Sequence, residues 1–465
     1  MKTKIIYILL IGLIFSACSD ETLNEINRDK DNPLEVPLRT ILPYVETHTA
    51  YAVVGGDGSL YMSTMIQHMT GVHAQLHQFD RFVYSATTFN NDWTAIYPGS
   101  LKNLRIMIEQ AANEEAYSYQ GIGLVLYAYN AMMATDSWGP VPFSQAASGE
   151  FFNPEYDTQE EIYTGDNGLL DLLDSAIVAL NTDTPIVPGD DDLIYGGDLG
   201  LWIKAANGLK AKMITRLGNT PYYDADAVIA AASNSFDSND EAFIFDAFSA
   251  GAETENPRFQ EANDRVHFAV SESFFNLLSG FNDPRGDLFF DDGYNSIPAP
   301  NGTADLDQGG AIYSKVYDYI EPDSPIQFMT YDELKLAEAE AHLRNNNAPE
   351  AYAAYLEALE AALRRAGVTD QDVIDAYLSE PSVAPGEGNL SLEDIYLQKY
   401  IGFYPFQSIE AWAEWRRTGV PNLFNPNGDL LRRWPYPQSE IDNNGENVPS
   451  GRPINGVYWD DLSEN

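Results

Sequence analysis

Two segments of the chain combine aromatic rings with amide, carboxylate and guanidinium groups, the side chains that recognise sugars. They are residues 79–91 and 294–318. The C–H face of a neutral sugar stacks on an aromatic ring and its hydroxyls pair with Asn, Asp, Gln or Arg, whereas a peptide needs backbone-pairing groups and deeper apolar pockets. The predicted ligand contacts are Phe79, Arg81, Tyr84, Asn90, Asn91, Tyr294, Asn295, Asn301, Tyr313 and Asp318.

Two other groups of residues have spacings that suit metal ligands. His73 and His77 are four residues apart and could share one helix face, with His68 and Asp80 nearby. A zinc site needs a third placed ligand and partners that orient the ligands, and no recognised metal motif surrounds this pair. We therefore interpret these histidines as ordinary polar residues and predict no metal site.

Three consecutive aspartates, residues 190–192, offer oxygen ligands that calcium prefers, but they lack the spacing of an EF-hand loop. A solvated acidic loop is the alternative interpretation. We predict no cofactor and leave a structural calcium ion at these aspartates as an open alternative.

The sequence lacks the short motifs that mark common catalytic sites. G-x-S-x-G, H-E-x-x-H, the P-loop and G-x-G-x-x-G are all absent. A glycosidase needs two placed carboxylates, but 70 acidic residues make any chosen pair uninformative. We predict that the protein is not an enzyme, with a lipid-anchored glycoside hydrolase as the less favoured alternative.

The only cysteine, Cys18, follows an apparent export signal. Two lysines precede an apolar run, and the small residues Ser16 and Ala17 stand directly before the cysteine. This arrangement resembles the lipobox of bacterial lipoproteins, in which the thiol is acylated and the chain is cut just before it. Because a lone cysteine cannot form an internal disulfide, we predict a signal peptide over residues 1–17 and a lipid anchor at Cys18.

The rest of the chain reads as globular and strongly acidic. Hydrophobic residues make up 44% and aromatic residues 12%, and 26 Lys and Arg face 70 Asp and Glu, for a net charge of -44. Such a surface repels polyphosphates, so nucleic-acid binding is disfavoured. Residues 18–43 are polar and proline-bearing and predict a lipidated tether and lead-in, followed by a folded domain over residues 44–465.

Helical periodicity dominates that domain. Apolar residues recur at helical spacing over residues 101–108, 122–133, 170–180 and 202–213. A hairpin of two Ala-rich helices follows, with Thr330 and Glu333 as a capping box, Pro349 in a first turn and Gly367 as a stop. Ala-rich helix hairpins are typical of tetratricopeptide-like pairs. The sequence therefore predicts a mostly α fold.

Long irregular stretches separate these helices and carry many aromatic residues, which indicates ordered loops. Large ordered loops on a helical scaffold are typical of a binding surface more than of a catalytic one. The stretches are residues 72–98, 184–198, 246–266, 281–328 and 424–465.

Six segments, in order along the chain, resemble the signature segments of SusD/RagB-type nutrient-binding lipoproteins, and in particular of the SusD-like branch. The resemblance implies four tetratricopeptide-like helix pairs, an extracellular lid over a SusC-type TonB-dependent transporter, no catalysis, and a calcium ion in many members. The segments are YPGSLKNLRIMIEQA, DSWGPVPFSQA, YGGDLGLWIKAANGLKAKMITRL, SPIQFMTYDELKLAEAEAHLR, KYIGFYPFQSIEAWAEWRRTGVPNL and RRWPYPQSEIDNN.

Most residues of these segments are predicted to build the scaffold. We expect Arg416 and Arg417 to tie loops down through carboxylates or carbonyls, and Trp138 to fix the exit of a helix. Ligand residues are expected where the resemblance fades, which includes residues 79–91 and 294–318.

The resemblance implies a lipoprotein of the outer membrane that faces the medium. Ser19, Asp20 and Glu21 resemble the acidic export signal of Bacteroidetes surface lipoproteins. The implied function is binding of nutrient oligosaccharides and their delivery to the transporter, with peptide uptake of the RagB kind as the alternative. The transporter is expected to meet the helical side, at residues 101–133 and 330–366.

Overall fold

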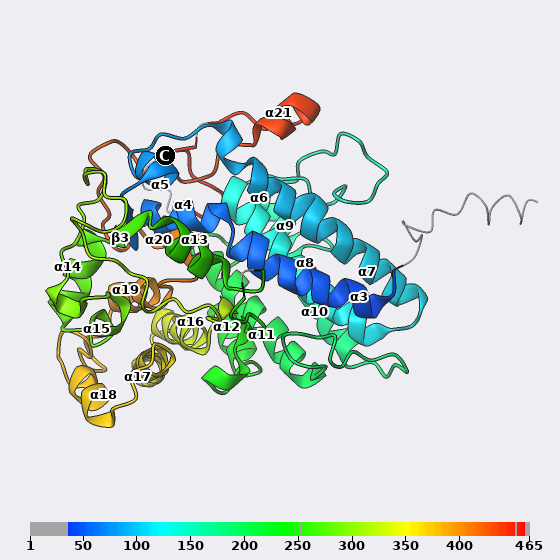
Figure 1. The fold of residues 1–465 in the computed structure, drawn as a ribbon. Coiled ribbons are helices and arrows are strands. Elements are labelled where there is room, and N and C mark those ends of the chain that lie inside the picture. Colours follow the sequence, from blue (N-terminus) through cyan, green and yellow to red (C-terminus); the bar gives the residue numbers. More distant parts are fainter. Residues whose placement is uncertain (1–35, 252, 452, 461–465) are drawn as a thin grey trace, which may run out of the picture.

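The computed structural model describes residues 36–251, 253–451 and 453–460, and α-helices dominate it (Figure 1). The mostly α prediction is confirmed. The longer helices are α3 (Leu38–His48), α7 (Lys102–Asn113), α8 (Tyr117–Trp138), α10 (Leu169–Leu180), α11 (Leu199–Arg216), α14 (Glu272–Phe281), α16 (Tyr331–Arg344), α17 (Ala348–Arg365), α19 (Leu392–Gly402) and α20 (Ser408–Thr418).

Shorter elements fill the stretches between these helices. The short α-helices are α4 (Asp57–Met65), α5 (Ala74–Phe79), α6 (Asn90–Thr94), α9 (Gln159–Thr164), α12 (Ala225–Ala232), α13 (Pro257–Arg265), α15 (Gly286–Phe289), α18 (Gln371–Leu378) and α21 (Gln438–Asn444). The π-helices are η1 (Thr49–Val54) and η3 (Ala95–Leu101), and the 3-10 helices are η2 (Ala86–Phe89), η4 (Asn239–Glu241) and η5 (Gly293–Asn295).

Strands form two short antiparallel pairs within the described residues. Strand β1 (Met69–Gly71) pairs with β3 (Phe268–Val270), with Thr70 opposite Ala269. Strand β2 (Phe243–Phe245) pairs with β4 (Ile326–Met329), and the register shifts after Phe243. The β1–β3 pair joins the segment after α4 to the segment after α13, and the β2–β4 pair joins the segment before α13 to the segment before α16.

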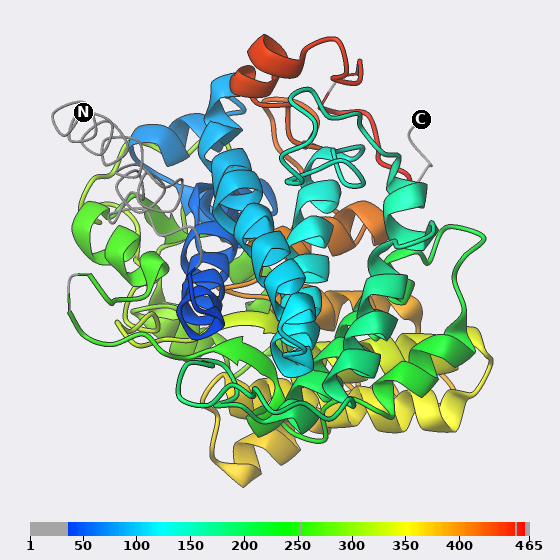
Figure 2. The same cartoon turned by 90° about the vertical axis from the view of Figure 1, so that its right-hand side faces the viewer.

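The scaffold is a succession of packed helices. Helix α8 lies between α7 and α10, and contacts then run from α10 to α11, from α11 to α12 and α16, and from α16 to α17. Nearly every residue of α8 is buried, so this helix has no solvent face. Figures 1 and 2 both place α17 and α18 at the end of the molecule opposite α21.

The helix hairpin α16–α17 forms where the sequence predicts it. The Thr330 hydroxyl accepts the Glu333 amide at 3.3 Å, and Gly367 ends the hairpin with φ of +99°. The capping box is only half formed, because the Glu333 carboxylate instead pairs with Lys212 at 2.9 Å. A buried lysine without a partner would be costly, so pairing takes precedence over the local cap.

The folded domain begins earlier than predicted. Helix α3 starts at Leu38 and buries Leu38, Ile41 and Leu42, whereas the sequence predicts a lead-in up to residue 43. Pro43 lies inside this helix, although proline disfavours a helix interior, because packing of the apolar face outweighs that local preference. The predicted signal peptide, Cys18 and the tether up to residue 35 lie outside the described residues.

A buried ion-pair network joins helices α11, α16, α19 and α20. Arg417 donates to both oxygens of Glu340, at 2.7 and 2.8 Å, and to Glu414 at 2.7 Å. Lys399 lies 3.0 Å from Glu340, and Arg216 lies 2.9 Å from Glu414. Although burial alone would raise the pKa of Glu340, Arg417 and Lys399 hold it below its usual value. Arg417 thus belongs to the scaffold, as predicted, but its guanidinium joins helices α16 and α20 and does not tie down a loop.

Arg416 ties the C-terminal loops to the end of α8. Its guanidinium lies 3.5 Å from the centre of the Trp412 ring and donates to the carbonyls of Asp136 at 2.6 Å and Arg432 at 2.9 Å. The buried Trp138 indole donates to the Pro435 carbonyl at 3.1 Å. Both residues therefore act in the scaffold, as the sequence predicts. No helix in the described part of the chain has the length and hydropathy to cross a bilayer.

Candidate ligand-binding site

Three loop segments meet at Asp80, directly after α5. Its carboxylate accepts the amide of Gly302 at 2.7 Å, and its backbone carbonyl accepts the Asn425 side chain at 2.9 Å. Gly302 has φ of +76°, and a Cβ there would lie 2.6 Å from the Asn425 side-chain oxygen. The neighbouring Arg81 donates to the carbonyl of Ala304. The two segments predicted from the sequence are therefore bound together, with a third segment around residue 425.

Replacing Asp80 with asparagine is expected to flatten the dependence of stability on pH. Burial raises the pKa of Asp80 to about 7, although the Gly302 amide and Arg81 act in the opposite direction. A raised carboxyl pKa gives stability that is complete below the unfolded value of about 3.9 and is lost as the pH rises through about 7. Asp80→Asn should thus gain stability relative to wild type at pH 8, by an amount on the order of 1–3 kcal/mol.

Denaturant unfolding of both proteins at pH 5, 6, 7 and 8 measures this difference. Parallel stability profiles for wild type and Asp80→Asn would contradict the assignment of a buried, proton-holding carboxyl at the loop junction.

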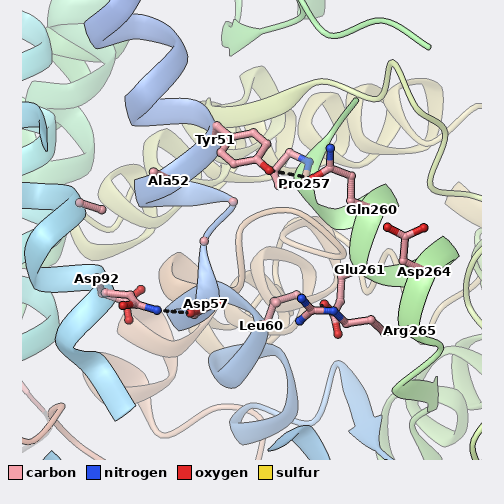
Figure 3. Close-up of a pocket in the computed structure, with 14 residues that line it drawn as sticks. Tyr51, Ala52, Asp57, Leu60, Asp92, Pro257, Gln260, Glu261, Asp264 and Arg265 are labelled. Carbon is pink, nitrogen blue, oxygen red and sulfur yellow. Dashed lines mark hydrogen bonds and ion pairs between the residues drawn. The ribbon is translucent and has the colours of Figure 1, made fainter. Parts of the chain in front are cut away.

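A hollow of about 320 Å³ opens where η1, α4, α6 and α13 approach one another (Figure 3). We call it the Tyr51 hollow. Among its lining residues, the Tyr51 hydroxyl donates to the Gln260 side-chain oxygen at 2.7 Å, and the Asn91 side-chain amide donates to the Asp57 carboxylate at 3.0 Å. The Tyr51 side chain is 41% exposed. The full lining is Tyr51, Ala52, Gly55, Gly56, Asp57, Leu60, Asn91, Asp92, Ala95, Pro257, Gln260, Glu261, Asp264 and Arg265.

Glycine is required where the walls of this hollow come closest. A Cβ at Gly55 would lie 2.4 Å from the Pro257 ring. The absence of a side chain therefore lets the end of η1 approach the first turn of α13, and this approach places Tyr51 beside Gln260.

Carboxylates give the Tyr51 hollow an acidic character. The buried Asp92 accepts the Gly58 amide at 2.8 Å, and burial raises the pKa of Asp92 to about 7. Glu261 pairs with Arg265 at 3.1 Å and lies 3.2 Å from His267. Burial raises the pKa of Glu261, while Arg265 lowers it. The hollow thus presents one ring with several hydrogen-bonding groups, the combination that holds a hydroxylated ligand.

The predicted ligand residues divide among different environments. Asn91 lines the Tyr51 hollow, and Asn301 lines a second hollow that also contains Phe424. Asn295 and Asp318 are exposed and line neither hollow. The backbone amide of Asp318 donates to the Asp291 carboxylate at 2.9 Å. The structure therefore brings the two loops together without converging these side chains on one cavity.

The predicted rings of the first segment belong largely to the core. Phe79 is 1% exposed and stacks on Tyr61 with ring centres 4.8 Å apart, so its ring is closed to a ligand and this prediction is wrong. Tyr84 is half-buried with its ring centre 6.0 Å from Phe79. Asn90 is half-buried, and its backbone carbonyl accepts the Thr94 hydroxyl.

The predicted rings of the second segment hold loops in place. The Tyr294 hydroxyl donates to the Asp283 carbonyl at 2.5 Å, and the Tyr313 hydroxyl accepts the Asp305 amide at 3.1 Å. Asn301 uses its amide group on Thr70 and on the Ser271 hydroxyl. These side chains are thus already engaged within the protein.

The candidate metal ligands have other partners. Asp192 accepts the amides of Ile194 and Gly197 and the Trp202 indole, and Asp191 accepts the Tyr119 hydroxyl at 2.7 Å. These bonds shape the turn before α11 and use the oxygens that calcium would need. Among the described residues, no group of three His, Cys, Asp or Glu side chains could hold a metal ion.

The two histidines of the predicted pair stand at α5. His73 precedes this helix and its ring centre lies 5.2 Å from that of His267, while His77 lies within the helix. Burial lowers the pKa values of His77 and His267, which favours the neutral ring.

Sequence reasoning missed Tyr51, Gln260 and Phe424. The Gly55–Gly56 pair is a local signal for a close backbone approach beside Tyr51. Phe424 directly follows a segment with strong family resemblance, where scaffold residues are expected.

Comparison with known proteins agrees with the fold. A family model described as "Starch-binding associating with outer membrane", of the SusD-like type, matches residues 34–437. A crystal structure of a SusD/RagB family protein from Bacteroides thetaiotaomicron is 30% identical, with a TM-score of 0.78, and the match covers 89% of this chain and 95% of that one. No curated protein matches the sequence significantly.

Two further solved structures share the fold at lower identity. A chitin-binding protein is 24% identical with a TM-score of 0.79, covering 91% of this chain and 100% of that one. A chitin-binding SusD homolog from Flavobacterium johnsoniae is 21% identical with a TM-score of 0.76, covering 92% and 99%. Because the family model spans most of the sequence and the Bacteroides protein is 30% identical, this chain belongs to the SusD/RagB family, in its SusD-like branch.

Proposed function

We propose that this protein is a surface lipoprotein of the outer membrane that binds nutrient oligosaccharides and delivers them to a SusC-type TonB-dependent transporter. Family membership supports this proposal, as do the starch-binding description of the family and the chitin binding of the two similar solved structures. The transporter is proposed to meet the helical side of the molecule, around α7, α8, α16 and α17.

The observation that carries the proposal is the Tyr51 hollow. Its side chains are mostly polar, and an exposed tyrosine ring lies beside amide, carboxylate and guanidinium groups. A peptide ligand would be better served by deeper apolar pockets, so this lining favours a sugar. Peptide uptake of the RagB kind is therefore the second candidate.

Replacing Tyr51 with alanine is expected to weaken glycan binding about five- to tenfold, because one stacked ring contributes about 1 kcal/mol. The matched variant Tyr51→Phe keeps the ring and loses only the hydroxyl bond to Gln260, so it should bind nearly as wild type. Calorimetric titration with maltoheptaose and chitohexaose measures both. If a glycan binds wild type and Tyr51→Ala equally, its site is not the Tyr51 hollow.

A further inference from the structure

A second hollow, of about 600 Å³, lies beyond the other end of α4. We call it the Phe424 hollow; besides Phe424 it is lined by Gln67, Asn276, Thr303 and Asn422. The Phe424 side chain is 76% exposed. Unlike an isolated exposed ring, Phe424 lines a cavity, so its face is available to stack on a ligand that enters the hollow.

The backbone beneath this ring is fixed. The Gln67 side chain donates to the Phe424 carbonyl at 2.6 Å and accepts the Ser273 hydroxyl at 2.6 Å. Asn425, the next residue, donates to the Asp80 carbonyl at the loop junction and is buried. The ring is therefore presented on an anchored turn, and this reduces the entropy lost when a ligand is bound.

The lining of the Phe424 hollow is nearly neutral. The chain has 70 acidic residues, yet the lining of this hollow contains one carboxylate, Glu272, and no lysine or arginine. Exposed Asn276, Asn422 and Thr303 form no side-chain hydrogen bond within the described structure. Free amides and a hydroxyl around an exposed ring match an uncharged, hydroxylated ring, and they offer little to an ion.

The two hollows are separate. Asp57 and Leu60, at the start of α4, line the Tyr51 hollow, whereas Gln67, just after the helix, lines the Phe424 hollow. The nine residues of α4 span about 14 Å at the usual helical rise. One sugar ring therefore cannot occupy both hollows.

We infer that the Phe424 hollow is a second sugar subsite, in which Phe424 stacks on a neutral sugar ring while Asn276, Asn422 and Thr303 pair with its hydroxyls. This inference rests on the proposed glycan-binding function and adds a second place of contact to it. An oligosaccharide that reaches both hollows binds more tightly than a short one, because the second contact is intramolecular.

Calorimetric titration of Phe424→Ala with maltoheptaose and chitohexaose tests the inference. The affinity for the glycan that binds wild type should fall about five- to tenfold, and Phe424→Trp should retain it. The matched control is Phe152→Ala, which removes a 98% exposed phenylalanine outside both hollows and should change nothing. Because Phe424 covers little of the core, all three variants should unfold near the wild-type temperature.

The outcomes separate this inference from the proposed function. A glycan that binds wild type and Phe424→Ala equally, while Tyr51→Ala binds it less well, overturns the second subsite and leaves the function in place. Equal losses in Phe424→Ala and Phe152→Ala would show a nonspecific effect and overturn the subsite as well. A wild-type protein that binds neither glycan contradicts the function and the subsite together.

Discussion

Replacing Arg417 with methionine is expected to lower the free energy of unfolding by about 3–5 kcal/mol. Arg417 is fully buried and donates to both oxygens of Glu340, which is itself fully buried, and to Glu414. Without the guanidinium, the carboxylates of Glu340 and Glu414 lose their shared cationic partner in the protein interior, where water does not solvate them. Removing one partner of a buried ion pair therefore lowers the free energy of unfolding by far more than the net contribution of the whole pair to stability.

The matched control lies at the end of α17. Arg364 pairs with Glu360 at 2.7 Å, but both side chains are 42% exposed. Arg364→Met should change the free energy of unfolding by less than about 1 kcal/mol, because water solvates the carboxylate that is left. Urea unfolding of both variants provides the comparison. Similar losses in the two would contradict the role assigned to the buried network.

Replacing Cys18 with alanine is expected to release the protein almost completely from the membrane fraction. Cys18 is the only cysteine in the sequence, and it follows the predicted signal peptide directly. Each buried CH₂ of an acyl chain contributes about 0.8 kcal/mol, so multiple acylation of one residue gives stable attachment.

Membrane fractionation and surface labelling of intact cells measure this release. Thr22→Ala, four residues further along the predicted tether, is the control and should remain attached and labelled at the surface. Attachment of Cys18→Ala at the wild-type level would refute the lipid anchor.

The helical scaffold is predictable because burial repeats with the period of the helix. The stripes at residues 101–133 and 170–213 correspond to α7, α8, α10 and α11, and the hairpin signals at Thr330 and Gly367 correspond to α16 and α17. Local rules fail where long-range packing outweighs them. Pro43 lies within α3, and the Glu333 carboxylate pairs with Lys212 instead of capping α16.

The loops are predictable as a binding region but not residue by residue. An aromatic or amide residue looks the same in the sequence whether its side chain faces a ligand or holds a loop. Only tertiary contacts separate the two roles. Phe79 lies in the core against Tyr61, and Tyr294 binds the Asp283 carbonyl. Tyr51 and Phe424 are exposed because distant segments pack beneath them, which sequence spacing does not encode.

The most direct test of glycan capture is calorimetric titration of the wild-type protein with neutral oligosaccharides, including maltoheptaose and chitohexaose, and with peptides of similar length. Glycan capture predicts saturable binding of at least one oligosaccharide, with a dissociation constant of about a micromolar order, and no binding of the peptides. Binding of peptides alone would contradict glycan capture and establish the peptide-uptake alternative.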